Sequence, residues 1–127
     1  MMTVTAVHHV AVCVTDLARS KRFYADVLGL EEIERPPLSV EGAWYGLANG
    51  QLHLIVHPPT RTLRGTTEID IADGHLALRI RDYEGALAHL RQHGVEVLDR
   101  PRNATPWKQI YFTDPDGNVI ELNVERG

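Results

Sequence analysis

The chain has 127 residues, about the size of one average domain, and carries 13 basic against 17 acidic side chains. Nucleic-acid-binding proteins show a concentrated basic surface, so this balance argues against a nucleic acid as partner. The first five residues lack the cationic and apolar segments of a signal peptide, and no apolar run approaches the roughly 18 residues of a membrane span. We therefore expect a cytoplasmic protein of one domain, residues 1–127, with no membrane partner.

The first strand pattern of the chain recurs in its second half. Residues 9–16 (His-Val-Ala-Val-Cys-Val-Thr-Asp) and residues 75–82 (His-Leu-Ala-Leu-Arg-Ile-Arg-Asp) share the pattern His-h-Ala-h-x-h-x-Asp, where h is aliphatic. Such alternation is typical of a half-buried strand, with the aliphatic residues on the core face and His9 and His75 on the opposite, more open face. The repeat predicts two modules of the same architecture.

A helix is predicted after each of these strands. Asp16 and Asp82 are suitable N-caps, because a short side-chain oxygen can accept from the free amides of a first helical turn. Apolar residues then recur at helical spacing, and each run ends at a glycine, Gly29 or Gly94, suited to the left-handed position after a helix. One helix is therefore expected between Asp16 and Gly29, and another between Asp82 and Gly94.

Three further strands are predicted in each module. They are residues 30–33, 44–47 and 51–56 in the first module, and residues 95–98, 109–112 and 119–124 in the second. Turn residues precede each last strand. The fold class is therefore α+β with two tandem βαβββ modules, module one over about residues 5–57 and module two over about 73–125, joined by a connection at residues 58–72.

Four potential metal ligands occupy equivalent places in the two modules. His9 and His75 begin the first strands, and His53 and Glu121 lie in the middles of the last strands, on the open faces by alternation. If a pseudo-twofold axis relates the modules, the four can converge on one point. Three imidazoles and one carboxylate suit a divalent ion such as Zn, Ni, Co, Mn or Fe(II) better than Mg or Ca.

Each of these residues also has a simpler interpretation. A lone histidine at a strand start is more often hydrogen-bonded or solvated than a ligand. His53 could be an ordinary cross-strand partner, and Glu121 an outward residue of an exposed sheet face. Their equivalence in the repeat favours ligation, although three ligands without His53 would suffice. His89 and His93 have a helical i, i+4 spacing that can bind metal but more often marks a solvated face.

The order of these motifs resembles the vicinal oxygen chelate superfamily, which includes glyoxalase I, fosfomycin-resistance thiol transferases, extradiol dioxygenases, methylmalonyl-CoA epimerase and bleomycin-resistance proteins. The resemblance covers roughly residues 5–125 and is carried by residues 9–17, Phe23-Tyr24, residues 27–30, Gly74-His75 and residues 114–122. It implies modules that form a curved, open mixed sheet around a metal. It also implies a homodimer whose sites combine His9 and His53 of one chain with His75 and Glu121 of the other.

The resemblance further implies bidentate chelation of adjacent substrate oxygens by the metal. The ligands of glyoxalase I correspond to the four positions above, except that His53 stands where glyoxalase I has a second glutamate. Glu121, the only carboxylate of the set, is then the predicted catalytic base. The leading interpretation is a metal-dependent lyase or isomerase of glyoxalase-like type that acts on a small substrate, free or thiol-conjugated.

Two other functions suit the same positions. A fosfomycin-type thiol transferase needs only His9, His75 and Glu121, and residues 108–117 look like the corresponding part of such enzymes. A ligand-sequestering protein of bleomycin-resistance type would use the same cavity without a metal. A dioxygenase is disfavoured, because a fourth protein ligand would take a position that catechol and oxygen need. Side chains that could line the cavity or bind an anionic substrate are Trp44, Tyr45, Trp107, Tyr111, Arg61, Arg64, Arg79 and Lys108.

Overall fold

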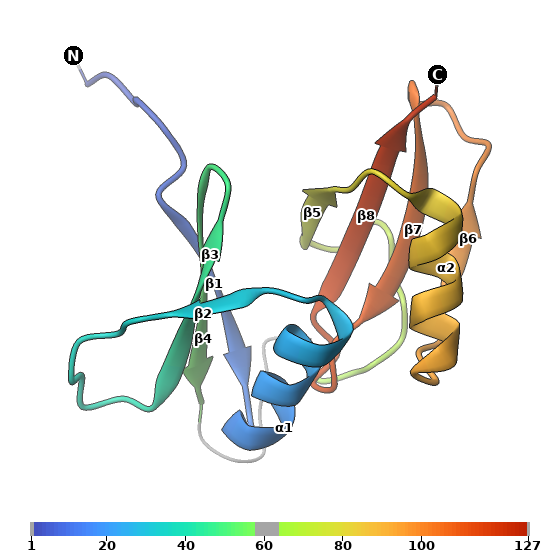
Figure 1. Ribbon diagram of the computed structural model, residues 1–127. Coiled ribbons are helices and arrows are strands. Elements are labelled where there is room, and N and C mark those ends of the chain that lie inside the picture. The colour runs from blue at the N-terminus through green and yellow to red at the C-terminus, as the bar shows by residue number, and fades with distance from the viewer. Residues whose placement is uncertain (1, 58–63, 127) are drawn as a thin grey trace. The chain divides into compact units, whose positions relative to one another are not determined.

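The computed structural model describes residues 2–57 and 64–126. The chain divides into two compact units, residues 1–63 and 64–127, and each unit contains one module (Figure 1). Residues 58–63 of the predicted connection lie outside the described residues. None of the helices in the described ranges has the length and apolar character that a membrane crossing requires.

Both units have the same topology. Unit one contains β1 (His9–Val14), α1 (Leu17–Arg22), the π-helix η1 (Phe23–Val27), β2 (Glu31–Ile33), β3 (Gly42–Leu47) and β4 (Gly50–Val56). Unit two contains β5 (His75–Arg79), α2 (Tyr83–Gln92), β6 (Leu98–Arg100), β7 (Trp107–Thr113) and β8 (Val119–Glu125). The sheet orders are β1-β4-β3-β2 and β5-β8-β7-β6, and only the β1–β4 and β5–β8 pairs are parallel. The α+β class and the two βαβββ modules are therefore confirmed.

The first helix differs from the single α-helix that the sequence predicts. Asp16 caps it as expected, and Gly29 follows it at a φ of +67°. Its second part, however, is the π-helix η1 rather than a continuation of the α-helix. Successive side chains project closer together around this wider turn, and the consecutive Phe23 and Tyr24 are both buried.

The second strand of unit two lies later than predicted. The sequence predicts residues 95–98, whereas β6 is Leu98–Arg100. The Val95 amide donates to a carbonyl of the last turn of α2 at 3.0 Å, and Gly94 adopts a φ of +71°. These contacts complete the helix end. Strand pairing can therefore begin only at Leu98, which lies opposite Tyr111 in β7.

Each sheet has a helix-covered core face. Leu52 and Leu54 are fully buried on that face of unit one, as are Ile110 and Ile120 on that of unit two. The predicted core residues of β1 and β5 alternate as expected but are mostly half-buried, since both strands lie at sheet edges. The opposite face of each sheet carries the predicted ligands, which positions the candidate site.

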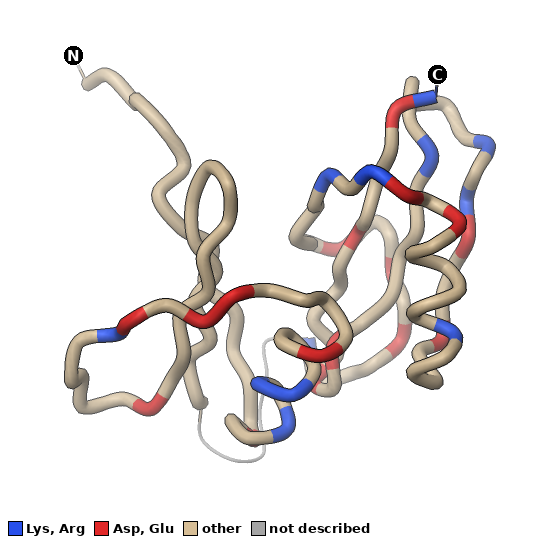
Figure 2. The backbone as a smooth tube through the Cα atoms, in the orientation of Figure 1, with Lys and Arg blue, Asp and Glu red and all other residues tan. Residues whose placement is uncertain are grey.

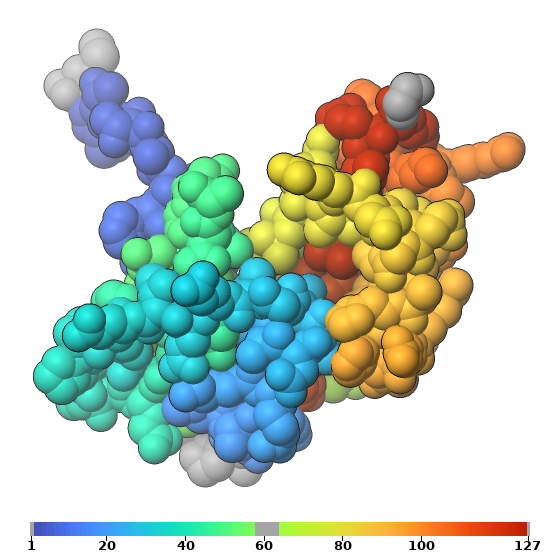
Figure 3. Space-filling model, viewed as in Figure 1, coloured from blue at the N-terminus to red at the C-terminus, as the bar shows by residue number. Residues whose placement is uncertain are grey.

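The periphery of unit one is polar or extended. Figure 2 shows basic residues along α1 and acidic residues along β2, and Lys21 Nζ lies 3.1 Å from Glu32 Oε2. Exposed pairs of this kind contribute about 0–1 kcal/mol to stability. The segment before β1 leaves Met2 85% and Val4 81% exposed, and Figure 3 shows it standing clear of the rest of its unit. The first strand, β1, begins only after this segment, at His9.

Candidate functional site

The two predicted ligands of unit two contact each other. Glu121 in β8 pairs with Ala77 in β5, so that His75, two residues earlier, lies on the same face of the neighbouring strand. His75 Nε2 is 3.2 Å from Glu121 Oε1. The His75 side chain is 24% exposed and that of Glu121 only 6%. Solvent can therefore reach the pair from the histidine side.

The other ring nitrogen of His75 determines what its Nε2 can do. His75 Nδ1 lies 2.8 Å from the carbonyl oxygen of Asp73, and a carbonyl oxygen only accepts, so Nδ1 carries a proton. In the neutral ring, Nε2 then presents a lone pair to the Glu121 carboxylate, which is also an electron-pair donor. The contact requires a cation between them, either a second proton on His75 or a metal ion. A backbone carbonyl is one of the usual partners of the second nitrogen of a ligating imidazole, so these residues fit a divalent ion.

The two oxygens of Glu121 have separate partners. Oε1 accepts from the Tyr111 hydroxyl at 3.0 Å, while Oε2 accepts from Asn123 Nδ2 at 2.8 Å and from Gln109 Nε2 at 3.4 Å. Burial alone would raise the pKa of Glu121, but the hydrogen bonds hold that pKa below its usual value. Burial and the contact with Glu121 raise the pKa of Tyr111, which stays a proton donor. Glu121 is thus held ionised, as a metal ligand must be.

The two predicted ligands of unit one lie in an aromatic stack. The ring of His53 lies against Trp44 at a centroid distance of 4.2 Å and an interplanar angle of 4°. The ring of His9 lies 4.0 Å from that of His53 at 15°. Because an imidazole lone pair lies in the ring plane, two nearly parallel rings cannot both aim at one ion. Unit one brings the two histidines together, but in a packing contact.

His53 is further restrained by its own hydrogen bond. Its Nε2 lies 2.8 Å from Gln51 Oε1, which makes Nε2 the donor. Burial lowers the pKa of His53, and the nearby His9, His8 and Arg35 lower it further. His53 is therefore a neutral imidazole held within the sheet face.

His53 and Glu121 lie on the predicted faces of their sheets, but both are buried there. Alternation places both opposite the core-facing residues, as expected, but they are 7% and 5% exposed. Trp44 and His9 cover one, and Tyr111 with its polar neighbours covers the other. Large side chains on adjacent strands close over these positions, which a pattern along one strand does not reveal.

The predicted cavity-lining aromatic residues divide between the two faces. Trp44 pairs with His53 and Tyr111 with Glu121, so both lie on the ligand-bearing faces. Trp107 has the same parity as Tyr111 in β7. Tyr45 is fully buried on the opposite face of unit one, and is excluded as a lining residue.

The predicted anion-binding residues also lie on different faces of the sheet of unit two. Arg79 lies on the ligand-bearing face, where it donates to Asn123 Oδ1 at 2.5 Å and pairs with Glu125 at 2.8 Å. Lys108 lies on the other face, with Nζ 5.2 Å from the Tyr83 ring, and Arg64 is engaged by Asp73 and the Gly117 carbonyl. Arg61 lies outside the described residues.

Sequence reasoning missed two polar partners of Glu121. Asn123 follows Glu121 by two residues in β8, and Gln109 precedes Tyr111 by two in β7. The parity of the strands could have identified both as neighbours on the ligand-bearing face.

Each unit holds two of the four predicted ligands. Among the residues that the structure describes, no three His, Cys, Asp or Glu side chains form a group that could hold a metal ion. The four-ligand set stays a prediction.

Comparison with known proteins defines the class. The family model for the Glyoxalase/Bleomycin resistance protein/Dioxygenase superfamily matches residues 6–122. The chain belongs to this superfamily, the vicinal oxygen chelate group that its motifs resemble.

Three known proteins are similar to this chain in sequence or in fold. Metallothiol transferase FosB of Staphylococcus epidermidis is 33% identical over 96% of this chain and 83% of its own length. The antibiotic-binding protein TnmS3 of a Streptomyces species is 27% identical, with a TM-score of 0.72 over 99% of this chain and 100% of its own. A mutant of the fosfomycin resistance protein FosX of Listeria monocytogenes, solved with Mn(II) and dihydroxypropylphosphonic acid, has a TM-score of 0.78 at 20% identity, over 98% of this chain and 95% of its own.

Proposed function

We propose that the protein is a metal-dependent enzyme that chelates adjacent oxygens of a small substrate and transfers a thiol to it. The observation that carries this proposal is the 3.2 Å contact between His75 Nε2 and Glu121 Oε1, with His75 oriented by the Asp73 carbonyl and Glu121 held ionised. His75, Glu121 and His9 are the proposed ligands, and the site would be shared within a homodimer. When bound, a divalent ion such as Mn, Zn, Ni, Co or Fe(II) would supply Lewis acidity toward the substrate oxygens.

The state of Glu121 separates thiol transfer from proton abstraction. A base that removes a proton from carbon works best with a raised pKa, near the working pH. Glu121 has a lowered pKa and accepts hydrogen bonds on both oxygens, which favours a ligand over a base. Thiol transfer needs no carboxylate base, since the second substrate brings the nucleophile.

The proposed reaction needs only the thiol and the oxygenated substrate. The thiol sulfur bonds to a substrate carbon, the carbon–oxygen bond at that carbon breaks, and the thiol proton ends on the freed oxygen. Residues of the chain would orient the substrate and exclude water around the Glu121 carboxylate. The FosB relative is named a metallothiol transferase, which supports this reaction class for the present chain.

Thiol consumption tests the proposal directly. Metal-loaded protein is incubated with fosfomycin and with cysteine or glutathione, and the loss of free thiol is followed. We expect thiol loss that requires added Mn²⁺ or Zn²⁺ and disappears in His75→Ala. The Lys108 side chain lies on the opposite face, so Lys108→Ala is the matched control and should retain activity. No thiol loss under any metal would contradict the proposal.

A glyoxalase-like lyase or isomerase is the second candidate. His53 occupies the place of the second glutamate of glyoxalase I, and its lowered pKa keeps the imidazole neutral and able to accept a proton. Isomerisation of the adduct between a 2-oxoaldehyde and a thiol, abolished by His53→Gln, would favour this candidate. Ligand binding without metal or turnover would instead favour the sequestering type, and the similar protein TnmS3 is named an antibiotic-binding protein.

A further inference from the structure

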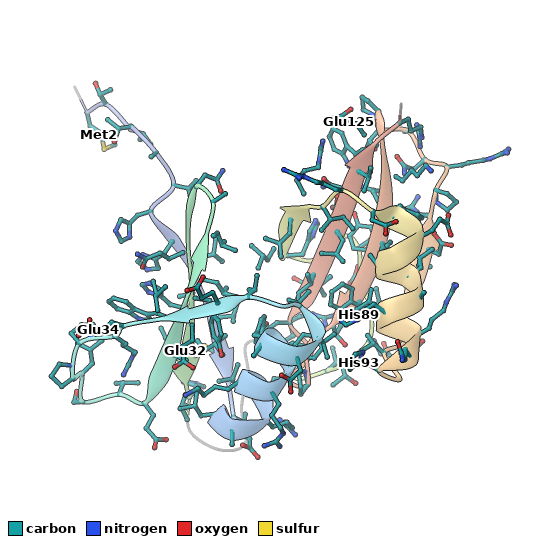
Figure 4. All side chains as sticks on the ribbon, in the orientation of Figure 1. Met2, Glu32, Glu34, His89, His93 and Glu125 are labelled. Carbon is teal, nitrogen blue, oxygen red and sulfur yellow. The ribbon has the colours of Figure 1, made fainter. Side chains whose placement is uncertain are left out.

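A second pair of imidazoles lies outside the candidate site, on α2. His89 and His93 are four residues apart and exposed at the C-terminal end of this helix, where Figure 4 labels both. Their ring centroids are 4.4 Å apart and the rings are tilted by 50°. Imidazoles that share one ion lie this close, because each ring nitrogen is about 2.1 Å from the metal. Unlike the stacked rings of unit one, tilted rings can direct their lone pairs toward a common point.

The protonation of His93 suits a ligand. Its Nδ1 lies 2.9 Å from the carbonyl oxygen of His89. Since the carbonyl oxygen can only accept, Nδ1 carries the proton, and Nε2 of the neutral ring presents its lone pair outward. The same arrangement, Nδ1 on a backbone carbonyl, orients His75 in the candidate site.

The electrostatics of the helix end also favour a cation. His93 is the C-cap residue of α2, so both rings lie at the end of the helix where the backbone dipoles present partial negative charge. The site is exposed on the surface, and water can fill the remaining coordination positions of an ion. Imidazole donors select Cu²⁺, Ni²⁺ and Zn²⁺ over Mg²⁺ and Ca²⁺.

We propose that His89 and His93 form a separate two-histidine site for Cu²⁺, Ni²⁺ or Zn²⁺ on the surface of unit two. The i, i+4 geometry exists only while α2 is helical, so ion binding should stabilise the folded protein. This site is independent of the proposed enzymatic function, and any count of bound metal would include both.

Titration with Ni²⁺ tests the pair. In a His75→Ala background, which removes a ligand of the candidate site, we expect one Ni²⁺ to remain per chain. Adding His89→Ala or His93→Ala should weaken that binding by at least about tenfold, because a second linked donor raises affinity steeply. Gln92→Ala, in the same helical turn, is the matched control and should leave the binding unchanged, because Gln92 is exposed and carries no charge. Ni²⁺ should raise the unfolding temperature only where both histidines are present.

The outcomes separate a pair from a single ligand. Equal loss in His89→Ala and His93→Ala, with two nitrogen couplings in the electron paramagnetic resonance spectrum of bound Cu²⁺, supports the proposal. Loss in only one variant, or unchanged binding in both, overturns it. Both positions are exposed and alanine favours helix, so far-UV circular dichroism should show that each variant keeps α2.

Discussion

The two units place different chemistry at the same topological positions. In unit one, β3 presents Trp44 opposite His53, and the ring faces stack. In unit two, β7 presents Tyr111 opposite Glu121, and the hydroxyl donates to the carboxylate. The neighbour matches the candidate ligand in each case, an aromatic face for an imidazole and a proton donor for an anion.

This difference favours unit two as the unit that binds an ion. The partners of Glu121 keep it charged and oriented, and those of His53 keep it neutral and packed. The internal repeat therefore preserves positions without preserving roles. We infer that unit two supplies the main metal-binding pair and that His53 supports the position of His9 from within the stack.

The largest effect is expected from Glu121→Gln. This variant keeps the side-chain shape but removes the charge, and we expect Mn²⁺ or Zn²⁺ affinity to fall more than about hundredfold, since losing even an outer partner of a ligand costs about 10- to 100-fold. His53→Gln, at the equivalent position of unit one, should cost less than about tenfold. Calorimetric titration of both variants measures this, and equal losses would refute the unequal roles.

The next effect concerns the residue that orients Glu121. Asn123→Ala removes the 2.8 Å hydrogen bond to Oε2, and we expect metal affinity to fall by about 10- to 100-fold. Gln51→Ala, which removes the partner of His53 in unit one, is the matched control. Competition with a chromogenic chelator gives both affinities. A larger loss in Gln51→Ala would reverse the assignment of roles.

The stack of unit one should matter for stability instead. Trp44→Leu removes the ring that lies 4.2 Å from His53, and aromatic contacts contribute about 0.5–1.5 kcal/mol beyond their buried area. We expect a lower free energy of unfolding in urea, with a smaller loss of metal affinity than in Asn123→Ala. Loss of metal binding at unchanged stability would show that the stack belongs to the metal centre.

Acid should act on the two units in different pH ranges. The folded pKa of His53 is lowered, so its stabilising contribution is complete above about pH 6.5 and is lost as the pH falls through the folded pKa. The folded pKa of Glu121 is also lowered, so its contribution persists to about pH 4.3 and is lost below that. The free energy of unfolding of the metal-free protein, measured across this pH range, should show both decreases in the parent chain. In His53→Gln the decrease below about pH 6.5 should be absent, while the decrease below about pH 4.3 should remain. A profile unchanged by His53→Gln would contradict the first assignment.

Patterns along single strands predicted the two modules, because the strands and helices of a module depend on local alternation and capping. Asp16, Asp82, Gly29 and Gly94 act as expected, since each makes contacts within a few residues. The late start of β6 was not predicted, because the end of α2 competes with the strand for the Val95 amide. The π-helix η1 was not predicted either, because burial of two adjacent aromatic residues is a tertiary effect.

Contacts between strands limited what could be predicted of the site. Parity placed His75 and Glu121 on one face, and the structure brings them together. Whether a neighbour covers a residue depends on register, which is why the burial of His53 and Glu121 and the roles of Gln109 and Asn123 were not foreseen.

The central claim is that His75 and Glu121 hold a divalent ion. The most direct measurement counts Mn²⁺ bound per chain by equilibrium dialysis of untagged His89→Ala protein, which lacks the proposed surface pair. We predict one ion per chain, lost when His75→Ala is added. Failure to bind Mn²⁺, Zn²⁺, Ni²⁺ or Co²⁺, or an unchanged count in the His75→Ala protein, would contradict the claim.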